Sequence, residues 1–405
     1  MRSVAILYVV SNLAACGQIF IDTLEDTNAP LDGSAPDTAD DVGSPLDAGP
    51  DVTDSSAPRT DAPATDAPVT DAPTDVFDAG MDVFDASIVD VGTDSGTLWR
   101  SDENACLDAE SGPLVEVSQV DTPQVAYGLW YKAPFLLSAE TTGGFASYRF
   151  DGARFQEIDR IPSIGFAEGI WDAGDAFIVG APGRGVFRIT IDDSGRLNLE
   201  SETNEPVREA RQAWGTDRTL FVPSGAMGLI ALVFDGTSYS EVATLPTRGF
   251  SQGVFAADTR VWLADGSSLR SLSFDGSSFR ELGSFDARST RVWVTDTSVY
   301  GTDDNRVLAF DRDDVNLGLR AAGGSSGGVI RDIWSDGVHI FAVAGAGGVF
   351  IFRDAGTDLV LVGRASTTGD GSESLGVVGD GEFIFVADGN AGLRAFSGFA
   401  CRRRR

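Results

Sequence analysis

The chain of 405 residues has little of what most enzyme sites are built from: one histidine, three cysteines and three methionines. A single His excludes metal sites made from several histidines, and it makes a Ser–His–Asp hydrolase depend entirely on His339. No Cys-x-x-Cys pair is present. The apolar stretch at the N-terminus, residues 4–10, is far too short to cross a bilayer. These absences leave no ready catalytic constellation.

Negative charge is unevenly distributed along the chain. The whole sequence has 61 Asp and Glu against 30 Lys and Arg, a formal charge of −31. Residues 17–98 contain 19 of these acids, one Arg and half of the 16 prolines. An acidic chain repels nucleic acid, so we expect no nucleic-acid partner. The uneven composition predicts an unfolded acidic segment followed by one folded region of about 300 residues.

The first residues, MRSVAILYVVSNLAAC, resemble a bacterial lipoprotein signal. Arg2 precedes the apolar run, and Leu13-Ala-Ala-Cys16 matches a lipobox, in which small residues precede a Cys that is lipidated. The resemblance implies a signal peptide over residues 1–15 and a membrane anchor at Cys16. Gly17 stands where an Asp would retain a lipoprotein at the inner membrane, which favours the outer membrane or cell surface. The alternative is an ordinary signal peptide followed by an incidental Cys.

Residues 16–98 are predicted to consist of the lipid-bearing Cys16 followed by a disordered tether. The segment repeats Thr-Asp-Ala-Pro at residues 60, 65 and 70, and it has too few hydrophobic residues to offset the entropy of ordering. Such an acidic Asp-Ala-Pro tether behind a lipobox resembles lipoproteins of myxobacteria and their relatives. The Thr and Ser residues beside Pro leave O-glycosylation open. No Asp-x-Asp-x-Asp-Gly run with a closing Glu is present, so we favour a solvated linker over Ca²⁺ binding in this segment.

Residues 99–401 contain seven copies of a unit of 38 to 44 residues. Each copy has a first mark, an aromatic or apolar residue, and about 20 residues later a second mark, Phe-Asp-Gly or a variant. The first marks are Trp130, Trp171, Trp214, Phe255, Trp293, Trp334 and Val378. Four short apolar stretches, separated by Gly- and Asp-rich turns, fill each of the first six copies, and no helical period is present. The pattern predicts an all-β fold, a seven-bladed β-propeller of four-stranded blades.

The two ends of the repeat region are expected to meet. The seventh copy stops after its third strand, near Phe396, and residues 114–120, which precede the first copy, can supply the missing fourth strand. Such closure by an N-terminal strand removes an exposed sheet edge. Cys106 and Cys401 flank these segments and would fall on the same rim, which predicts a disulfide in an extracytoplasmic protein. Two unpaired thiols are the alternative.

A resemblance to the LVIVD-repeat propellers of bacterial surface proteins is carried by Phe385-Val-Ala-Asp-Gly-Asn-Ala-Gly-Leu-Arg-Ala-Phe and Leu359-Val-Leu-Val-Gly. It covers residues 114–400 and implies the propeller fold without any enzymatic activity. The chain departs from these repeats at one turn, where Phe-Asp-Gly replaces their Asp-x-Ser-x-Pro.

Candidate ligand-binding residues lie three and two positions before the first marks. In a propeller these positions begin the innermost strands, close to the axis. The six candidates chosen from these positions are Glu168, Arg211, Gln252, Arg291, Arg331 and Asp332. We predict that the arginines clamp an anion, a sugar or a protein terminus there, with channel-lining salt bridges as the alternative. The aromatic marks themselves are predicted to be core between blades.

The function predicted from the sequence is that of a membrane-anchored binding or scaffolding propeller, for which no cofactor is expected. Its expected partner is a protein or a cell-surface glycan, and the propeller itself is expected to be monomeric. The alternative is a lactonase- or hydrolase-like propeller enzyme acting at the ring mouth. Weak candidates for a metal such as Ca²⁺ are Asp303, Asp304, Asn305 and Asp388. The basic tail, residues 402–405, is either a solvated end or a contact for anionic lipid or polysaccharide.

Overall fold

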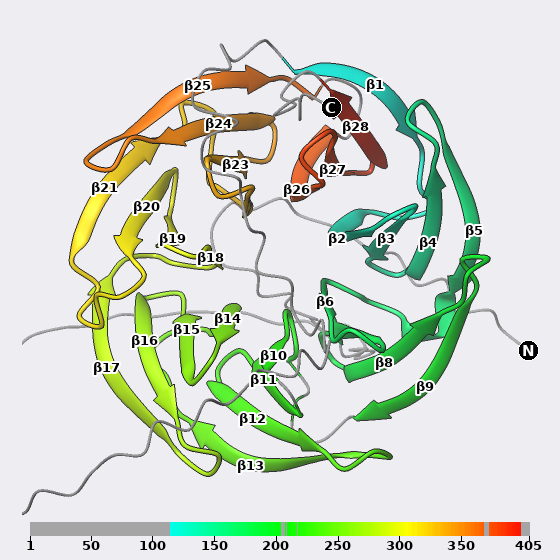
Figure 1. The fold of residues 1–405 in the computed structure, drawn as a ribbon. Coiled ribbons are helices and arrows are strands. Elements are labelled where there is room, and N and C mark those ends of the chain that lie inside the picture. Colours follow the sequence, from blue (N-terminus) through cyan, green and yellow to red (C-terminus); the bar gives the residue numbers. More distant parts are fainter. Residues whose placement is uncertain (1–113, 204–206, 208, 217, 368–371, 398–405) are drawn as a thin grey trace, which may run out of the picture. The chain divides into compact units, whose positions relative to one another are not determined.

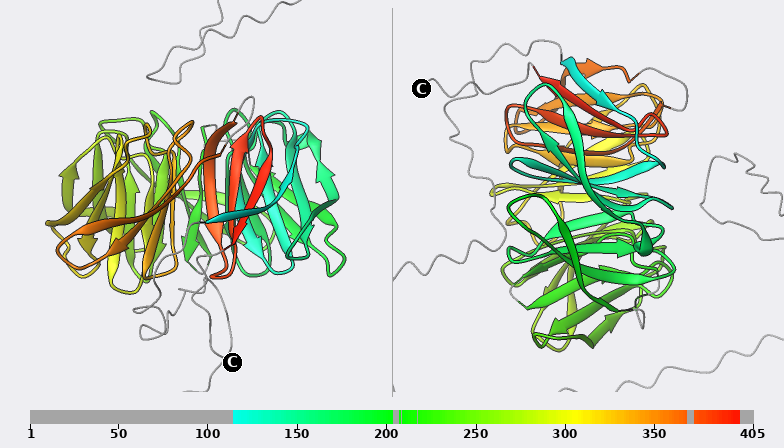
Figure 2. Two further views of the ribbon diagram at one scale, coloured as in Figure 1. Left: turned by 90° about the horizontal axis from the view of Figure 1, so that it is seen from above. Right: turned by 90° about the vertical axis from the view of Figure 1, so that its right-hand side faces the viewer.

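The computed structural model describes residues 114–203, 207, 209–216, 218–367 and 372–397. These residues form 28 β-strands and one 3₁₀ turn, Pro162–Ile164 (η1), so the predicted all-β fold is confirmed. The sheets stand around a common axis (Figure 1), and their strands run between the two faces of the ring (Figure 2). No helix in this part of the chain is long and apolar enough to span a membrane. The predicted signal peptide, tether and basic tail, with Cys16, Cys106 and Cys401, lie outside the described residues.

Five of the sheets have four antiparallel strands each, and each sheet follows the order of the chain. The first two are β6 (Gly169–Asp172), β7 (Phe177–Ala181), β8 (Gly185–Ile191), β9 (Leu197–Thr203), and β10 (Trp214–Thr216), β11 (Thr219–Pro223), β12 (Leu229–Phe234), β13 (Tyr239–Leu245). The other three are β14 (Gly253–Ala257), β15 (Arg260–Ala264), β16 (Ser268–Phe274), β17 (Phe279–Asp286); β18 (Val292–Val294), β19 (Ser298–Asp303), β20 (Arg306–Asp311), β21 (Leu319–Gly324); and β22 (Asp332–Ser335), β23 (His339–Val343), β24 (Val349–Asp354), β25 (Leu359–Ala365).

The remaining sheet has eight strands and contains both ends of the described chain. Its strands are β1 (Val115–Val120), β2 (Ala126–Lys132), β3 (Phe135–Glu140), β4 (Gly144–Phe150), β5 (Phe155–Ile161), β26 (Ser372–Gly379), β27 (Ile384–Gly389) and β28 (Leu393–Ser397). Only one residue pair, Ala126 with Gly389, joins β2 to β27. Strand β1 pairs antiparallel with β28, with Val115 opposite Ser397. The strand expected at residues 114–120 is therefore present and lies beside the last strand of the chain.

The Phe-Asp-Gly marks are turns, as their composition predicts. In one of them, Asp275 Oδ1 accepts hydrogen bonds from the backbone N–H groups of Ser277 and Ser278. These hydrogen bonds hold the pKa of Asp275 at about 2, and Gly276 takes a positive φ of 94°. Each such turn connects the third strand of a sheet to its outer fourth strand.

The aromatic marks pack together on the axis, and we call them the axial aromatic cluster: Trp130, Trp171, Trp214, Phe255, Trp293 and Trp334. The ring of Trp214 lies at its centre, 4.0 Å from Phe255 and 5.8 Å from Trp293 between centroids. It also lies 5.9 Å from Trp130, which comes from a sheet that is not its neighbour in sequence. These residues were predicted to form core between blades. The contacts between non-adjacent sheets show that they also meet across the axis.

Candidate functional site

The innermost strands are β2, β6, β10, β14, β18, β22 and β26 (Figure 1), and the face where they begin is called here the upper face. In four of these strands the residue two positions before the aromatic or apolar mark is Gly. A Cβ at Gly128 would stand 1.9 Å from the carbonyl oxygen of Glu168, and one at Gly376 would stand 2.2 Å from that of Tyr127. The backbones of neighbouring inner strands therefore touch there, which only Gly allows.

In the other three sheets this position, at or just before the inner strand, has a polar residue: Gln212, Arg291 or Asp332. Gln212 Oε1 accepts a hydrogen bond from the backbone N–H of Val254 at 3.1 Å, and Asp332 Oδ2 accepts one from Val377 at 3.1 Å. Arg291 Nη1 donates to the carbonyl of Thr290, and its Nε lies 3.6 Å from Asp332 Oδ1. Side-chain bridges thus replace the backbone contact between these sheets.

Glu168 and Arg211 form an ion pair one position earlier in the register. Arg211 Nη1 lies 2.8 Å from Glu168 Oε1 and 3.1 Å from Oε2, and the Glu168 side chain is buried. The guanidinium also lies over the ring of Phe250, 5.2 Å from its centroid. Its Nε is buried and makes no hydrogen bond within the described part of the chain. Arg211 therefore keeps one donor unused at this site.

Tyr127 lies close to the charged groups of Glu168, Arg211 and Arg291. Burial and the nearby Glu168 raise the pKa of its hydroxyl, while Arg291, Arg211 and Arg331 oppose that rise. Burial alone would lower the pKa of Arg291. The nearby Tyr127, Asp332 and Glu168 outweigh burial, so the pKa of Arg291 is above its usual value. We name the five residues Tyr127, Glu168, Arg211, Arg291 and Asp332 the axial polar cluster. They come from five different inner strands or from the three residues before them.

Both carboxyl groups of the axial polar cluster are harder to ionise than usual. Burial raises the pKa of Asp332 to about 6, although Arg291 and the N–H of Val377 act against it. Burial likewise raises the pKa of Glu168 despite the opposing effect of Arg211 and Arg291. Perturbed pKa values from buried, mutually facing charges are common at functional sites. The cluster therefore combines fixed donors and acceptors with low solvent exposure.

Four of the six predicted ligand residues belong to this cluster, and two lie apart from it. Arg331 is half exposed and its Nη2 lies 3.5 Å from Glu373 Oε1. Gln252 is half-buried, and its backbone N–H donates to the carbonyl of Ala264. Tyr127 and Gln212 were not among the predicted residues, although their places in the repeat register could have identified them. Ligand binding by these residues stays a prediction.

The weak metal candidates lie in two separate places. Asp303 accepts the backbone N–H of Arg288 at 3.0 Å and pairs with Arg306, while the side-chain amide of Asn305 donates to a backbone carbonyl. Asp388 is buried in another sheet, 2.6 Å from Arg394 Nε. Among the residues that the structure describes, no three His, Cys, Asp or Glu side chains are grouped to hold a metal ion. A Ca²⁺ site at these residues or at Asp304 stays a prediction.

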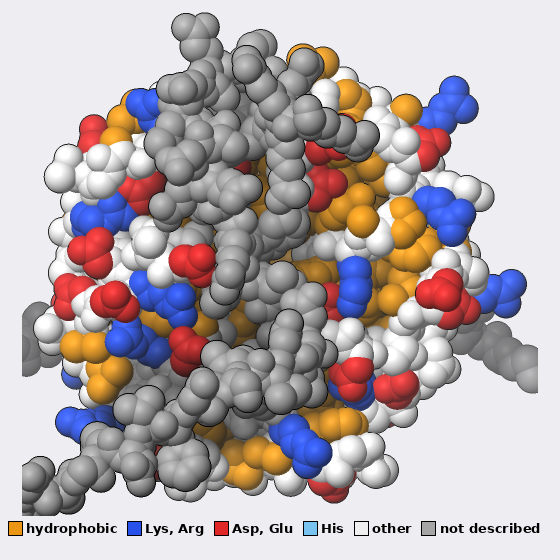
Figure 3. Space-filling model, in the orientation of Figure 1, with side chains coloured by type: hydrophobic (Ala, Val, Ile, Leu, Met, Phe, Trp, Pro, Cys, Tyr) orange, Lys and Arg blue, Asp and Glu red, His pale blue; other side chains and the backbone are white. Residues whose placement is uncertain are grey.

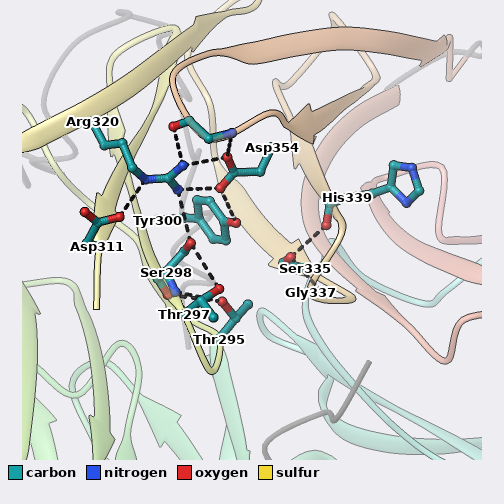
Figure 4. A network of polar contacts seen from close by, with 11 residues as sticks. Thr295, Thr297, Ser298, Tyr300, Asp311, Arg320, Ser335, Gly337, His339 and Asp354 are labelled. Carbon is teal, nitrogen blue, oxygen red and sulfur yellow. Dashed lines mark hydrogen bonds and ion pairs between the residues drawn. The ribbon is translucent and has the colours of Figure 1, made fainter. Parts of the chain in front are cut away.

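The single histidine is buried at the start of β23. Its backbone N–H donates to Asp336, and the Ser335 hydroxyl donates to its carbonyl at 2.7 Å. Figure 4 shows its imidazole turned away from a polar network in which Arg320 joins the sheet of β18–β21 to Asp354 of the next sheet. Arg320 Nη1 lies 2.8 Å from Asp354 Oδ1, and Tyr300 donates to Oδ2 at 2.8 Å. This network fastens two sheets together.

Exposed apolar side chains accompany the axial polar cluster on the upper face. Phe250 precedes β14, Val329 precedes β22 and Met227 lies in the turn from β11 to β12. Their exposed fractions are 38%, 47% and 46%. On the face of the ring that Figure 3 draws, acidic and basic side chains are interspersed. Arginine and aromatic side chains side by side are typical of protein interfaces.

Comparisons with known proteins identify the fold. No protein-family model and no curated protein matches the chain. The β-propeller domain of Cps50 (Swd1) from Myceliophteria thermophila matches with a TM-score of 0.58 and 10% identity, over 70% of this chain and 99% of that one. The Pan2 WD40 domain of Neurospora crassa matches with a TM-score of 0.57 and 13% identity, over 72% and 99%. The computationally designed Ika8 protein matches with a TM-score of 0.52 and 10% identity, over 70% and 99%. The described residues are therefore similar to β-propellers in fold, and the predicted propeller is confirmed at this level.

Proposed function

We propose that this chain is a membrane-anchored, extracytoplasmic propeller that binds or scaffolds a partner at the axial polar cluster. The partner class is a protein, or a cell-surface glycan as the second choice. The proposal rests on the cluster itself. Five side chains from five parts of the ring are held in place there, and Arg211 Nε makes no hydrogen bond within the described residues. Such preorganised charges lose little entropy when a partner binds.

The proposal includes a ring of seven blades closed by the N-terminal strand. The eight-stranded sheet then counts as two blades, β2–β5 and β26–β28 with β1, since a single residue pair links them. Antiparallel pairing of β1 with β28 supports this count. Closure of this kind makes a rigid support, and rigid supports improve the precision of a binding site.

A protein partner is favoured over a glycan by the apolar side chains beside the cluster. Phe250 is exposed and stacks with Arg211, so one partner could cover the aromatic ring and reach the charged centre. The axial aromatic cluster fills the axis with packed rings, which limits the depth that a bound segment can reach. We therefore expect a short terminus or a loop of the partner to enter the centre, with the rest lying on the upper face.

The same proposal includes three features that rest on the sequence: the lipid anchor at Cys16, the acidic tether, and an outer-membrane or surface location. A disulfide between Cys106 and Cys401 is part of it as well. Support comes from the adjacency of Val115 and Ser397, because these residues lead toward the two cysteines along the chain. Mass spectrometry of the intact protein, alkylated without reductant, tests this pairing. We expect no label on Cys106 or Cys401.

Site-specific photo-cross-linking in intact cells tests the binding proposal. A photoreactive residue at position 250 should capture a defined species, and the same residue at Leu199 on the outer strand β9 serves as the control. Replacement of Arg291 by Met should abolish the adduct from position 250 without loss of the folded protein. Equal adducts from positions 250 and 199, or an adduct unaffected by Arg291→Met, would contradict the proposal.

A further inference from the structure

A pocket of 270 Å³ opens between the sheet β6–β9 and the sheet β10–β13. Asp175 comes from the hairpin that joins β6 to β7, and Phe234 and Tyr239 flank the hairpin that joins β12 to β13. Both hairpins lie where the inner strands end, on the face opposite the axial polar cluster. Arg188 of β8 and Trp171 of β6 complete the walls on which this inference rests.

The pocket exists because one sheet departs from the packing that the others use. In each copy the first mark, on the innermost strand, pairs with a residue of the second strand, and that residue pairs with one on the third strand. On the third strand that residue is small or aliphatic in six of the seven copies: Ser147, Ala231, Ser271, Ala309, Ile351 and Ala395. In the remaining copy it is Arg188, opposite Ile178. In five of these six copies the second-strand partner is aromatic: Phe221, Trp262, Tyr300, Phe341 and Phe385.

Arg188 is a buried cation surrounded by groups that fix its position. Its Nη2 lies 2.7 Å from Asp175 Oδ2, its Nε lies 3.0 Å from Glu200 Oε2, and its guanidinium covers the ring of Phe234 at 4.7 Å. Burying a charge is a costly way to fill a core position for which six copies use a small or aliphatic residue. The arrangement therefore points to a ligand rather than to packing.

The walls of the pocket indicate the chemistry of that ligand. Two arginines and two aspartates line it, so the pocket has no strong preference for an ion of either sign. Asp175 keeps its Oδ1 without a hydrogen bond inside the described ranges, which leaves an acceptor at the rim. A saccharide unit presents an apolar C–H face to aromatic rings and hydroxyl groups that both donate and accept. The small volume suits one such unit, because pockets for larger ligands begin at about 300 Å³.

We propose that the Arg188 pocket binds a neutral saccharide unit, stacked on Phe234 or Tyr239, with Asp175 and Arg188 bonded to its hydroxyl groups. The site shares no residue with the axial polar cluster, so this proposal stands or falls independently of the proposed function. It adds a second recognition surface on the opposite face of the ring.

Saturation-transfer NMR on the full chain tests the proposal directly. The probes are the methyl glycosides of glucose, galactose, mannose, rhamnose and N-acetylglucosamine, with sodium acetate and sodium sulfate as anionic probes. At least one glycoside should bind with a dissociation constant in the millimolar range or below. Asp175→Asn should weaken that binding about tenfold, and since Asp175 is exposed, its replacement should leave the fold intact. Asp258→Asn, in the equivalent hairpin of β14–β17 and also paired with an Arg, should change nothing.

A double variant, Ile178→Phe with Arg188→Ala, copies the arrangement of Phe221 and Ala231. It should fill the pocket, keep a cooperative thermal transition and abolish glycoside binding. The proposal is overturned if no glycoside in the panel binds at millimolar concentration, or if binding survives in both pocket variants. It is also overturned if acetate or sulfate displaces the glycoside and binds more tightly, since the pocket would then be an anion site.

Discussion

Asp332 accepts a hydrogen bond from the backbone N–H of Val377, 45 residues further along the chain, at 3.1 Å. The bond crosses from one sheet to the next at the point where neighbouring inner strands elsewhere meet through Gly. The same carboxylate also faces Arg291 of the preceding sheet, 3.6 Å away. Asp332 therefore links three consecutive parts of the ring and belongs to the candidate site as well.

The raised pKa of Asp332, about 6, predicts a loss of stability between roughly pH 4 and pH 6. In that window the unfolded chain has released the proton and the folded chain still holds it, so a rise in pH favours unfolding. The loss should reach up to about 3 kcal/mol, since one pKa unit corresponds to about 1.4 kcal/mol. Urea unfolding from pH 4 to pH 7 measures it.

Asp332→Asn provides the matched control for this pH dependence. Its free energy of unfolding should change less across the same window, because the titrating group is gone and Asn can still accept from Val377. The buried Glu168 titrates in both proteins and contributes equally to both profiles. Parallel profiles for the two proteins would show that Asp332 titrates normally.

Gly128→Ala should lower the free energy of unfolding by about 3 kcal/mol. The new Cβ would stand 1.9 Å from the carbonyl oxygen of Glu168, so two inner strands would have to move apart. Gly324→Ala, at the end of β21, serves as the control, because nothing lies within 4 Å of its Cβ position. Denaturant unfolding of the two variants compares them, and equal stabilities would refute the proposed strand contact.

Trp214→Ala should be more harmful than Trp214→Phe. The alanine variant removes the ring at the centre of the axial aromatic cluster and should cost about 3–5 kcal/mol. The phenylalanine variant keeps a ring but leaves the carbonyl of Ala256 without the indole N–H, which lies 2.9 Å away, and should cost about 1–3 kcal/mol. Thermal unfolding followed by circular dichroism would reveal the order, and a reversed order would argue against axial packing by Trp214.

Arg394→Met should test how strongly β1 is fastened to the end of the chain. Arg394 Nη1 lies 2.7 Å from Glu116 of β1, and its Nε lies 2.6 Å from the buried Asp388. The variant leaves the Asp388 carboxylate without its cation and should cost about 3–5 kcal/mol. Glu116→Gln removes only the outer half of the pair and should cost about 1 kcal/mol or less. Chemical denaturation of both variants is the measurement, and similar small losses would mean that Asp388 is well solvated.

Much of the fold could be predicted from the repeat. The Phe-Asp-Gly marks specify turns through local hydrogen bonds to Asp275 and its counterparts, so they are legible in the sequence. The strand before the first copy was predicted from a simple count of strands, and it pairs with β28 as that count required. The register of the candidate site was also predictable, because it follows the aromatic marks at fixed spacing.

Other features depend on contacts that no local pattern encodes. The aromatic marks were predicted to be core between blades, but the sequence does not specify which of them meet: Trp130 and Trp214 come from non-adjacent sheets and pack across the axis. The pairing of Glu168 with Arg211, 43 residues apart, depends on the angle between two sheets. The Arg188 pocket lies between two sheets, where Arg188 occupies a position that the other copies give to a small or aliphatic residue, and only the packed structure reveals it.

The strand order, the turns and the residues that begin each inner strand could be read from the sequence, because they follow from short-range spacing and backbone chemistry. The tertiary structure decided which of those residues are partners, how deeply they are buried and where the ring is hollow. Those properties depend on distances between segments remote in the chain. A shift of one sheet by a few ångströms would leave every repeat intact and yet separate Arg291 from Asp332.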